Sequence, residues 1–264
     1  MTARSFLVRG LLAGLLAGLF TFVVAHQVGE PHVEAAIGLE AAGAAASEAD
    51  GHGEGVAAHG GEDHGDEGTT VSRGDQRTWG LLTGTVVVGT ALGGLVALVA
   101  AGVVGRLGRI RPAQSTLLVA LLGFVSVALV PFLKYPATPP AVGNAETIGE
   151  RTNEYFGYLA ISLLAAVVAV AVARALVPRL GGFEAVVAGV ALYLVVVVGF
   201  GQLMPTVNEV GDFPADLLWY FRRASLITLA TLWGSLAVIL TFLVKRLDTS
   251  TSAVQARRDL AASL

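Results

Sequence analysis

Six long apolar runs constrain the fold of this chain more than any other feature of its sequence. Each run is long enough to cross a hydrocarbon core of roughly 30 Å as a helix. Lipid offers no hydrogen-bond partner to an open backbone, so segments of this kind are expected to be α-helical. The sequence therefore predicts an all-α integral membrane protein in which residues 1–264 form a single membrane domain. Its transmembrane helices are expected at about 6–25, 80–104, 115–133, 155–177, 185–204 and 217–244.

The amino-acid composition supports a membrane protein and narrows its chemistry. Hydrophobic residues make up 54% of the chain and charged residues only 14%, which leaves too little polar surface for a soluble globule. The chain contains no cysteine, so any bound metal has to use nitrogen and oxygen ligands, as exchangeable divalent ions do. A net charge of −3 offers no basic surface for nucleic acid, and the expected partner is the lipid bilayer.

Charged residues are sorted between the connections that join the runs. Eleven of the 17 Lys and Arg residues lie before the first run, between the second and third, between the fourth and fifth, or after the sixth. Seventeen of the 20 acidic residues lie in the other three connections. Short connections rich in Lys and Arg are typical of the cytoplasmic side of a membrane. Both termini are therefore expected in the cytoplasm, and the acidic connections outside it.

The first run has a second interpretation, as a cleaved signal peptide. Arg4 and Arg9 precede it, and it ends in the small residues of segment 23–25, as at a cleavage site. Its apolar stretch is longer than the ~7 to 15 residues of a signal peptide, which favours a retained helix. Glycines at every fourth residue support retention, because they let helices approach closely, although an Ala/Gly-rich chain would contain such spacings anyway. They are Gly10, Gly14 and Gly18 in the first run, and Gly80, Gly84, Gly89 and Gly93 in the second.

Potential metal ligands gather between the first two runs, where all five histidines lie. Imidazole and carboxylate groups are the ligands that borderline divalent cations such as Co²⁺, Ni²⁺ and Zn²⁺ accept. His26, Glu30 and Glu34 follow at intervals of four residues, and Pro31 suits the first turn of a new helix. We hypothesise a hydrated metal-entry site here; an ordinary solvated turn is the alternative. Its ligands are His26, Glu30, His32, Glu34 and, from the third outer connection, Asp216.

The stretch 43–70 differs in kind from the segment before it. It consists of Gly, Ala, Asp, Glu and His in low-complexity order and is expected to be disordered, because it cannot bury enough apolar surface to fold. Its histidines are spaced seven and five residues apart, which matches no rigid ligand motif. We expect weak, rapidly exchanging capture of cations in this extracytoplasmic loop; a solvating linker without metal affinity is the alternative. The capturing residues are His52, His59, Asp63 and His64.

The second outer connection is expected to lead into the fourth helix along an extended, proline-rich path. Thr147 stands in capping-box spacing with Glu150. Arg151 follows at once, and Glu154 lies one turn further. Because unpaired charges near lipid are costly, Arg151 is expected to pair with a carboxylate. In the third connection, Trp219 is expected at the membrane interface.

Residues for energy coupling or catalysis are missing from the sequence. Neither of its two lysines follows a glycine, which excludes a phosphate-binding G-K-[ST] loop. No carboxylate stands in the middle of an apolar run, where an ion-coupled pump usually has one. Hydroxyl groups do stand there. They either line a passage or bond back to carbonyls of their own helices, and the second role is the commoner one. Without a catalytic constellation, the chain is not expected to be an enzyme.

Three segments occur in the order GLLAGLLAGLFTFVVAHQVGEPHVEAAIGLE, LVPFLKYPATPPAVGNAETIGERTNEYFGY and FPADLLWYFRRASLITLATLWGSL. In combination they resemble the signature regions of the family of probable cobalt transporter subunits (CbtA). The resemblance implies a bacterial inner-membrane protein that brings in Co²⁺ for cobalamin synthesis, beside a small single-span partner subunit with a histidine motif. The residues to which it points are Glu30, Pro31, Glu34, Glu40, Lys134, Tyr135, Pro136, Pro139, Pro140, Thr147, Arg151, Thr152, Asp216, Trp219, Phe221 and Arg222.

Two functions from different classes follow. The first is uptake of a divalent transition metal, Co²⁺ or alternatively Ni²⁺, by a transporter subunit that has no permanently bound cofactor. The second is a membrane-anchored metal receptor or scaffold that delivers ions to a separate translocator. Six spans favour transport, whereas the lack of a carboxylate at the midplane favours the receptor.

Overall fold

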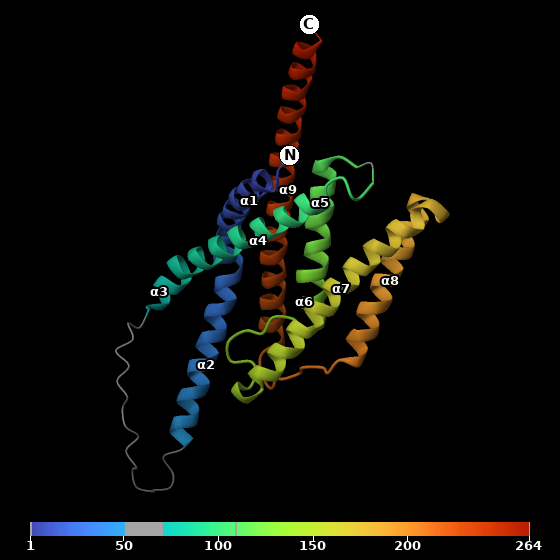
Figure 1. Ribbon diagram of the computed structural model, residues 1–264. Coiled ribbons are helices and arrows are strands. Elements are labelled where there is room, and N and C mark those ends of the chain that lie inside the picture. The colour runs from blue at the N-terminus through green and yellow to red at the C-terminus, as the bar shows by residue number, and fades with distance from the viewer. Residues whose placement is uncertain (1, 51–70, 109, 264) are drawn as a thin grey trace.

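The computed structural model describes residues 2–50, 71–108 and 110–263, and every regular element in those ranges is a helix (Figure 1). Three elements are π-helical (η1, η3, η4) and one is a 3₁₀ turn (η5). The elements are α1 (Ala3–Val24), η1 (Ala25–Gly29), α2 (Glu30–Asp50), α3 (Arg73–Asp75), η3 (Gln76–Gly80), α4 (Leu81–Val103), α5 (Pro112–Gly123), η4 (Phe124–Leu129), α6 (Val130–Lys134), η5 (Ala145–Thr147), α7 (Ile148–Leu180), α8 (Gly182–Leu203) and α9 (Ala215–Ala262).

These elements join into six helical rods that are long and apolar enough to cross a membrane. This confirms the all-α class and the expected number of spans. Several rods run past the apolar runs that predicted them. At 48 residues, α9 is about 72 Å long for a rise of 1.5 Å per residue. The expectation of disorder from residue 43 does not hold for 43–50, an alanine-rich end of α2 where helix propensity is high, and residues 51–70 lie outside the described part of the chain.

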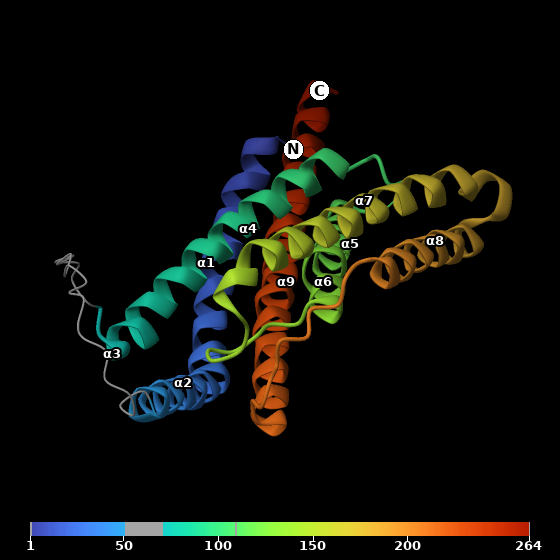
Figure 2. The same ribbon diagram turned by 90° about the horizontal axis from the view of Figure 1, so that it is seen from below.

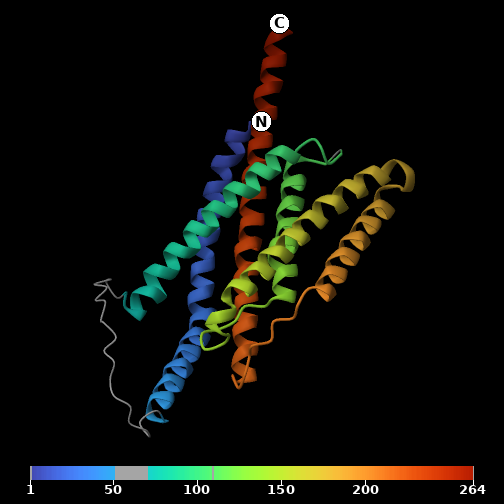
Figure 3. The same ribbon diagram turned by 60° about the horizontal axis from the view of Figure 1, so that its bottom comes forward.

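The rods are arranged around α9. Figure 1 and Figure 3 show α9 running through the middle, with α1 and α4 on one side and the α7–α8 pair on the other, and Figure 2 shows the same pairing from below. Both termini lie toward one end of the bundle (Figure 1). We call the opposite end, which holds the connections 135–147 and 204–214, the loop end.

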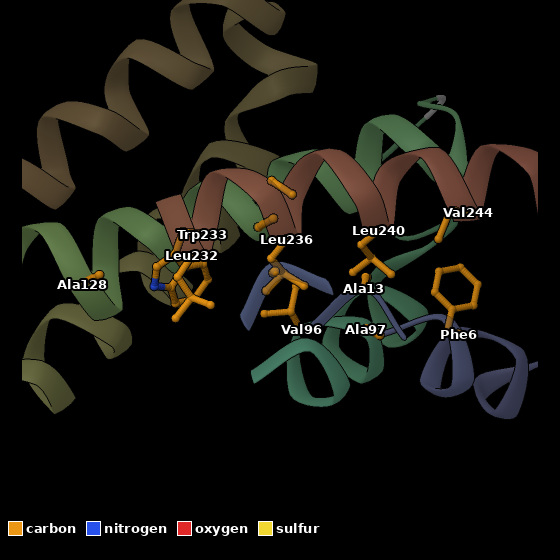
Figure 4. Packing of buried hydrophobic residues seen from close by; sticks show 14 residues of the cluster. Phe6, Ala13, Val96, Ala97, Ala128, Leu232, Trp233, Leu236, Leu240 and Val244 are labelled. Carbon is orange, nitrogen blue, oxygen red and sulfur yellow. The ribbon is translucent and has the colours of Figure 1, made fainter. Parts of the chain in front are cut away.

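Apolar side chains of α9 form the core with α1, α4 and α5 (Figure 4). Leu236, Leu240 and Val244 are fully buried along α9. Further along α9 toward the loop end, but still well inside the span, Trp233 packs against Phe124 with ring centroids 6.5 Å apart. The partners of α9 in this core include Phe6, Ala13, Val96, Ala97 and Ala128.

The backbones of α1 and α4 touch along a line of glycines. A Cβ atom on Gly14 would clash with the carbonyl oxygen of Gly89, and one on Gly10 with that of Gly93. Gly18 meets α4 in the same way at Thr85. The expected close packing is therefore confirmed for the first run and for the later glycine pair of the second. It is wrong for Gly84, where a Cβ atom would meet open space, and for Gly80, where it would make only ordinary contact at 3.7 Å.

Two π-helical segments end two residues before a proline. Gly29, the last residue of η1, precedes Pro31 in this way, and Leu129, the last of η4, precedes Pro131. A proline ring clashes with the carbonyl four residues earlier, and the wider π turn relieves that clash without ending the rod. Pro31 does occupy the first turn of α2, as expected, but α2 continues directly from α1 through η1.

Candidate functional site

Glu30 and Glu34 of α2 are held by two arginines from the start of the next rod. Arg73 contacts Glu30 at 2.5 Å, and Arg77 contacts Glu34 at 3.1 Å. The two pairs are each four residues apart on their own helix, so they stand one above the other. The Glu30 side chain is only 9% exposed, whereas that of Glu34 is 62% exposed. The carboxylates expected to receive a metal are thus neutralised by cations in this structure.

His26 belongs to the same face of the helix. Its Nδ1 atom lies 3.3 Å from the carbonyl oxygen of Arg77, and its ring stacks on Phe22 at 5.7 Å. If Nδ1 donates to that carbonyl, Nε2 is left as the nitrogen with a free lone pair. His26, Glu30 and Glu34 therefore follow each other along one side of η1 and α2, and Pro31 does not interrupt that face.

His32 faces α9 instead. Its ring stacks on that of Tyr220 with centroids 5.9 Å apart. The guanidinium of Arg223 in turn lies over the Tyr220 ring, 4.9 Å from its centroid. Asp216 is exposed one turn before Tyr220. The structure brings His32 and the first turns of α9 close together, on a different side of α2 from Glu30.

The five expected ligands do not form a preassembled cage. No group of three His, Asp or Glu side chains that could hold a metal ion occurs among the described residues. His52, His59, Asp63 and His64, the expected capture residues, lie outside the described residues. Glu40 is exposed on α2, beyond the two ion pairs.

The proline-rich connection is bound to the connection before α9. Lys134 Nζ donates to the Met204 carbonyl at 3.1 Å, and the Tyr135 hydroxyl donates to that of Pro205 at 3.0 Å. Residues 136–139 have no regular secondary structure, as expected for an extended path, and Pro139 is buried while Pro136 and Pro140 are half-buried. Burial and the nearby Glu154 carboxylate raise the pKa of the Tyr135 hydroxyl.

Arg151 pairs with a carboxylate, as expected, but its partner is distant in sequence. Its Nε atom lies 3.6 Å from Glu209, and its Nη2 atom donates to the Asn144 carbonyl at 2.9 Å. The Asn144 N–H donates to the same Glu209 carboxylate at 2.9 Å. Thr147, the Asn144 N–H and the Arg151 guanidinium together lower the pKa of Glu209.

The capping box expected at Thr147 and Glu150 is wrong. Thr147 does precede α7, but its hydroxyl donates to the Asn144 carbonyl at 3.0 Å and caps no N–H of the helix. Glu150 is exposed, and one oxygen of Glu154 is buried without a hydrogen-bond partner in the described structure. The 3₁₀ turn η5 directly precedes α7.

A cavity of about 870 Å³ opens among η1, α2, α4, η4, α6, α7 and α9 near the loop end. Most of its wall is apolar, and its charged residues are Arg151 and Arg222. Trp219, three residues before Arg222, is 65% exposed on the outside of the bundle, which suits the interfacial position expected for it.

Hydroxyl groups inside the spans bond mainly to their own helices. Ser126, Thr228 and Thr231 donate to carbonyls four residues earlier, at 2.7 to 2.9 Å. Ser162 instead exchanges a hydrogen bond of 2.8 Å with Tyr193 of the neighbouring helix. The commoner of the two roles considered for these residues is therefore the one found.

Sequence reasoning missed Arg73, Arg77 and Tyr220 as neighbours of the expected ligands. A signal for the arginines was present, because their spacing of four residues equals that of Glu30 and Glu34. Nothing comparable in the sequence pointed to the stacking of Tyr220 on His32.

The chain was compared with known families, curated proteins and solved structures. The family model of the probable cobalt transporter subunit (CbtA) matches residues 3–245. No curated protein and no solved structure matches the chain.

Proposed function

We propose a function on one premise: the chain belongs to the family of probable cobalt transporter subunits (CbtA). It is a multi-pass membrane protein of six spans, and it takes part in the uptake of Co²⁺ across the bacterial inner membrane, in support of cobalamin synthesis. Ni²⁺ is the alternative cargo, because selectivity at nitrogen and oxygen ligands depends on geometry more than on affinity.

The observation that carries this proposal is the paired ladder of Glu30 and Glu34 with Arg73 and Arg77. A divalent cation that arrives at the loop end exchanges places with the guanidinium groups. The two carboxylates and His26 Nε2 then supply oxygen and nitrogen ligands along one side of the helix, and water fills the remaining positions. His32, on the side of α2 that faces α9, and Asp216, in the first turn of α9, provide the next ligands. The arginines keep the carboxylates neutralised until the ion replaces them.

The segment 51–70 collects ions for this site. His52, His59, Asp63 and His64 bind weakly and exchange quickly, so they raise the local concentration of cation without trapping it. The loop end faces out of the cytoplasm, in agreement with the acidic connections there. A negative-inside membrane potential favours entry by about 2.3 kcal/mol per charge for each 100 mV.

The energy coupling, for which the sequence offers no phosphate-binding loop and no midplane carboxylate, comes from other transport subunits, among them a small single-span partner subunit with a histidine motif. The receptor function remains the second candidate, and the hydroxyls of Ser126, Thr228 and Thr231 favour it, because each donates its hydrogen to a carbonyl of its own helix. In that case the same ladder loads an ion that a separate protein moves.

Uptake of ⁵⁷Co²⁺ by cells that express the chain, alone and with its genomic neighbours, tests transport. Metal flux into liposomes that contain only the purified chain separates the two candidates, since a receptor binds without flux. No uptake above the vector control in either cell experiment contradicts the transport proposal.

Substitutions at the ladder test the entry site. Glu30→Gln with Glu34→Gln should raise the Co²⁺ concentration for half-maximal binding, whereas Arg73→Ala should lower it by removing the competing cation. Glu40→Gln is the matched control, because Glu40 is an exposed carboxylate of the same helix outside the ladder. Equal effects of the Glu30/Glu34 and Glu40 variants would rule out this site.

A further inference from the structure

The cavity near the loop end has a charge that a cation pathway would not need. Arg151 from α7 and Arg222 from α9 both line it, and no Asp or Glu is among its lining residues. Two guanidinium groups at one end of a membrane cavity repel a divalent cation and attract an anion. The cavity and the ladder on α2 therefore suit ligands of opposite charge.

Arg222 has no partner within the described part of the chain. No hydrogen bond or ion pair reaches it, and its Nε atom is buried without an acceptor. Arg151 is only partly satisfied, since its Nε is also without a hydrogen bond and its carboxylate partner lies 3.6 Å away. A guanidinium half-buried in a membrane domain is costly unless an anion balances it. The described residues do not supply that anion at Arg222, which leaves the role to a bound ligand.

The wall of the cavity changes character along α9. Arg222 lies at the loop end, and Trp233, eleven residues later and so about 16 Å deeper, lines the far part. Between them α9 contributes Leu229 and Leu232 together with Ser225 and Thr228, whose hydroxyls donate to carbonyls of their own helix. Val88 and Leu92 of α4 add to the apolar wall. Tyr135 and Thr138, by contrast, lie beside the charged end. The cavity is thus cationic at the loop end and mainly apolar along the rest of α9.

We infer that this cavity binds an acidic phospholipid, with its phosphate between Arg151 and Arg222 and an acyl chain lying along α9 toward Trp233. Guanidinium groups bind phosphate oxygens through paired, charge-assisted hydrogen bonds. Trp219 places the charged end at the depth of lipid head groups. A volume of about 870 Å³ falls in the range of ~300–1,000 Å³ that accommodates a small amphiphilic ligand. The deep apolar wall favours an amphiphile over free phosphate.

The test is lipid rebinding to the delipidated full-length chain in detergent, measured by native mass spectrometry and by the shift in the melting temperature. Phosphatidylglycerol should bind and raise the melting temperature, and phosphatidylcholine with the same acyl chains should not. Arg222→Gln should weaken phosphatidylglycerol binding by about tenfold or more, the order expected for a lost hydrogen-bonded charge pair. Arg223→Gln is the matched control, because Arg223 is the exposed neighbour that lies over Tyr220 and does not line the cavity.

Further arms identify the source of the anion. Leu229→Trp, which fills the deep part and keeps both arginines, should also reduce phosphatidylglycerol binding, and Arg222→Lys should bind between wild type and Arg222→Gln. Equal binding of the two lipids, or equal loss in the Arg222→Gln and Arg223→Gln variants, would overturn the proposal. Protection by sodium phosphate that equals that of phosphatidylglycerol would assign the site to a free anion instead. Loss of a partner subunit from Arg222→Gln with unchanged lipid binding would assign it to a carboxylate of that subunit. None of these readouts depends on metal transport.

Discussion

Glu30 and Glu34 form similar ion pairs, but Glu30 is nearly buried and Glu34 is exposed, so the two pairs should contribute differently to stability. Removal of Arg73 by Arg73→Ala leaves the nearly buried Glu30 carboxylate without its partner, which should lower the free energy of unfolding by about 1 to 3 kcal/mol. The Arg77–Glu34 pair is exposed on both sides, so Arg77→Ala should change it by no more than about 0.5 kcal/mol. Denaturant unfolding in detergent measures both. Equal losses for the two variants would show that burial does not decide the strength of these pairs.

Glu209 makes a prediction about pH. Its pKa is lowered from the ordinary value of 4.5, so the carboxylate keeps its bonds at neutral pH and loses them only as the pH falls through the lowered value. The Asn144 amide should therefore exchange its hydrogen slowly at pH 5 to 7, roughly the range in which any glutamate is ionised. Glu209→Gln should speed this exchange over the whole range. Glu146→Gln is the control, because Glu146 is an exposed carboxylate in the connection that holds Asn144. An unchanged exchange rate in Glu209→Gln would contradict the assignment.

At the scale of residues, the sequence predicted types of partner better than their identity. Arg151 was expected to pair with a carboxylate because charge near lipid requires it, and it does. Its partner is Glu209 instead of a neighbour on its own helix, since two connections distant in sequence meet at the loop end. The spacing of His26, Glu30 and Glu34 is compatible with one side of a helix, but Pro31 left open whether one helix continues through all three. Whether arginine or a metal ion is their partner depends on how the rod that contains α2 packs against the rod that begins with α3. The spacing of residues along one helix gives no information on that packing.

The glycine contact between α1 and α4 gives a prediction at the scale of elements. Gly14→Ala places a methyl group against the Gly89 backbone, which should cost about 1 to 3 kcal/mol of unfolding free energy because neither backbone can yield locally. Gly84→Ala is the matched control on α4, since its methyl group meets open space. It should be neutral or stabilising by up to about 1 kcal/mol through helix propensity. A tolerated Gly14→Ala would mean that the two helices separate easily.

Helix boundaries were less predictable than helix existence. Apolar runs mark the part of a rod that lies in lipid, but polar, alanine-rich segments such as 43–50 continue the helix into water. Pro31 was expected in the first turn of a new helix. It does stand in the first turn of α2, but the rod continues from α1 without a break because a π-helical segment precedes the proline, and a π-helical segment precedes Pro131 in the same way. The sequence contains both prolines, but the compensation is a property of the folded rod.

The family match does not tell which side of the membrane each end of the bundle faces, and the chain is well suited to an experiment that does. It contains no cysteine, so single cysteines can be introduced without a background. Ala3, Thr138 and Ser252 are exposed positions near the amino terminus, at the loop end and near the carboxyl terminus. With a membrane-impermeant maleimide, intact cells should label the Thr138→Cys variant only, and inverted vesicles should label the other two.

The Ala3→Cys variant also tests whether the first helix is retained. Cleavage after residue 25 would remove Phe6 and Ala13 from the core. It would also expose Gly89 and Gly93 of α4, which in the described structure pack closely against the backbone of α1. The mature protein should therefore keep α1, and inverted vesicles should label Ala3→Cys to the same extent as Ser252→Cys. Labelling of Ser252→Cys alone would mean that α1 is removed and that the remaining five rods cover this surface in another way. Labelling of Thr138→Cys in inverted vesicles would mean that the orientation is the reverse of the one proposed. The ladder would then lie on the cytoplasmic side, where it would release metal instead of receiving it.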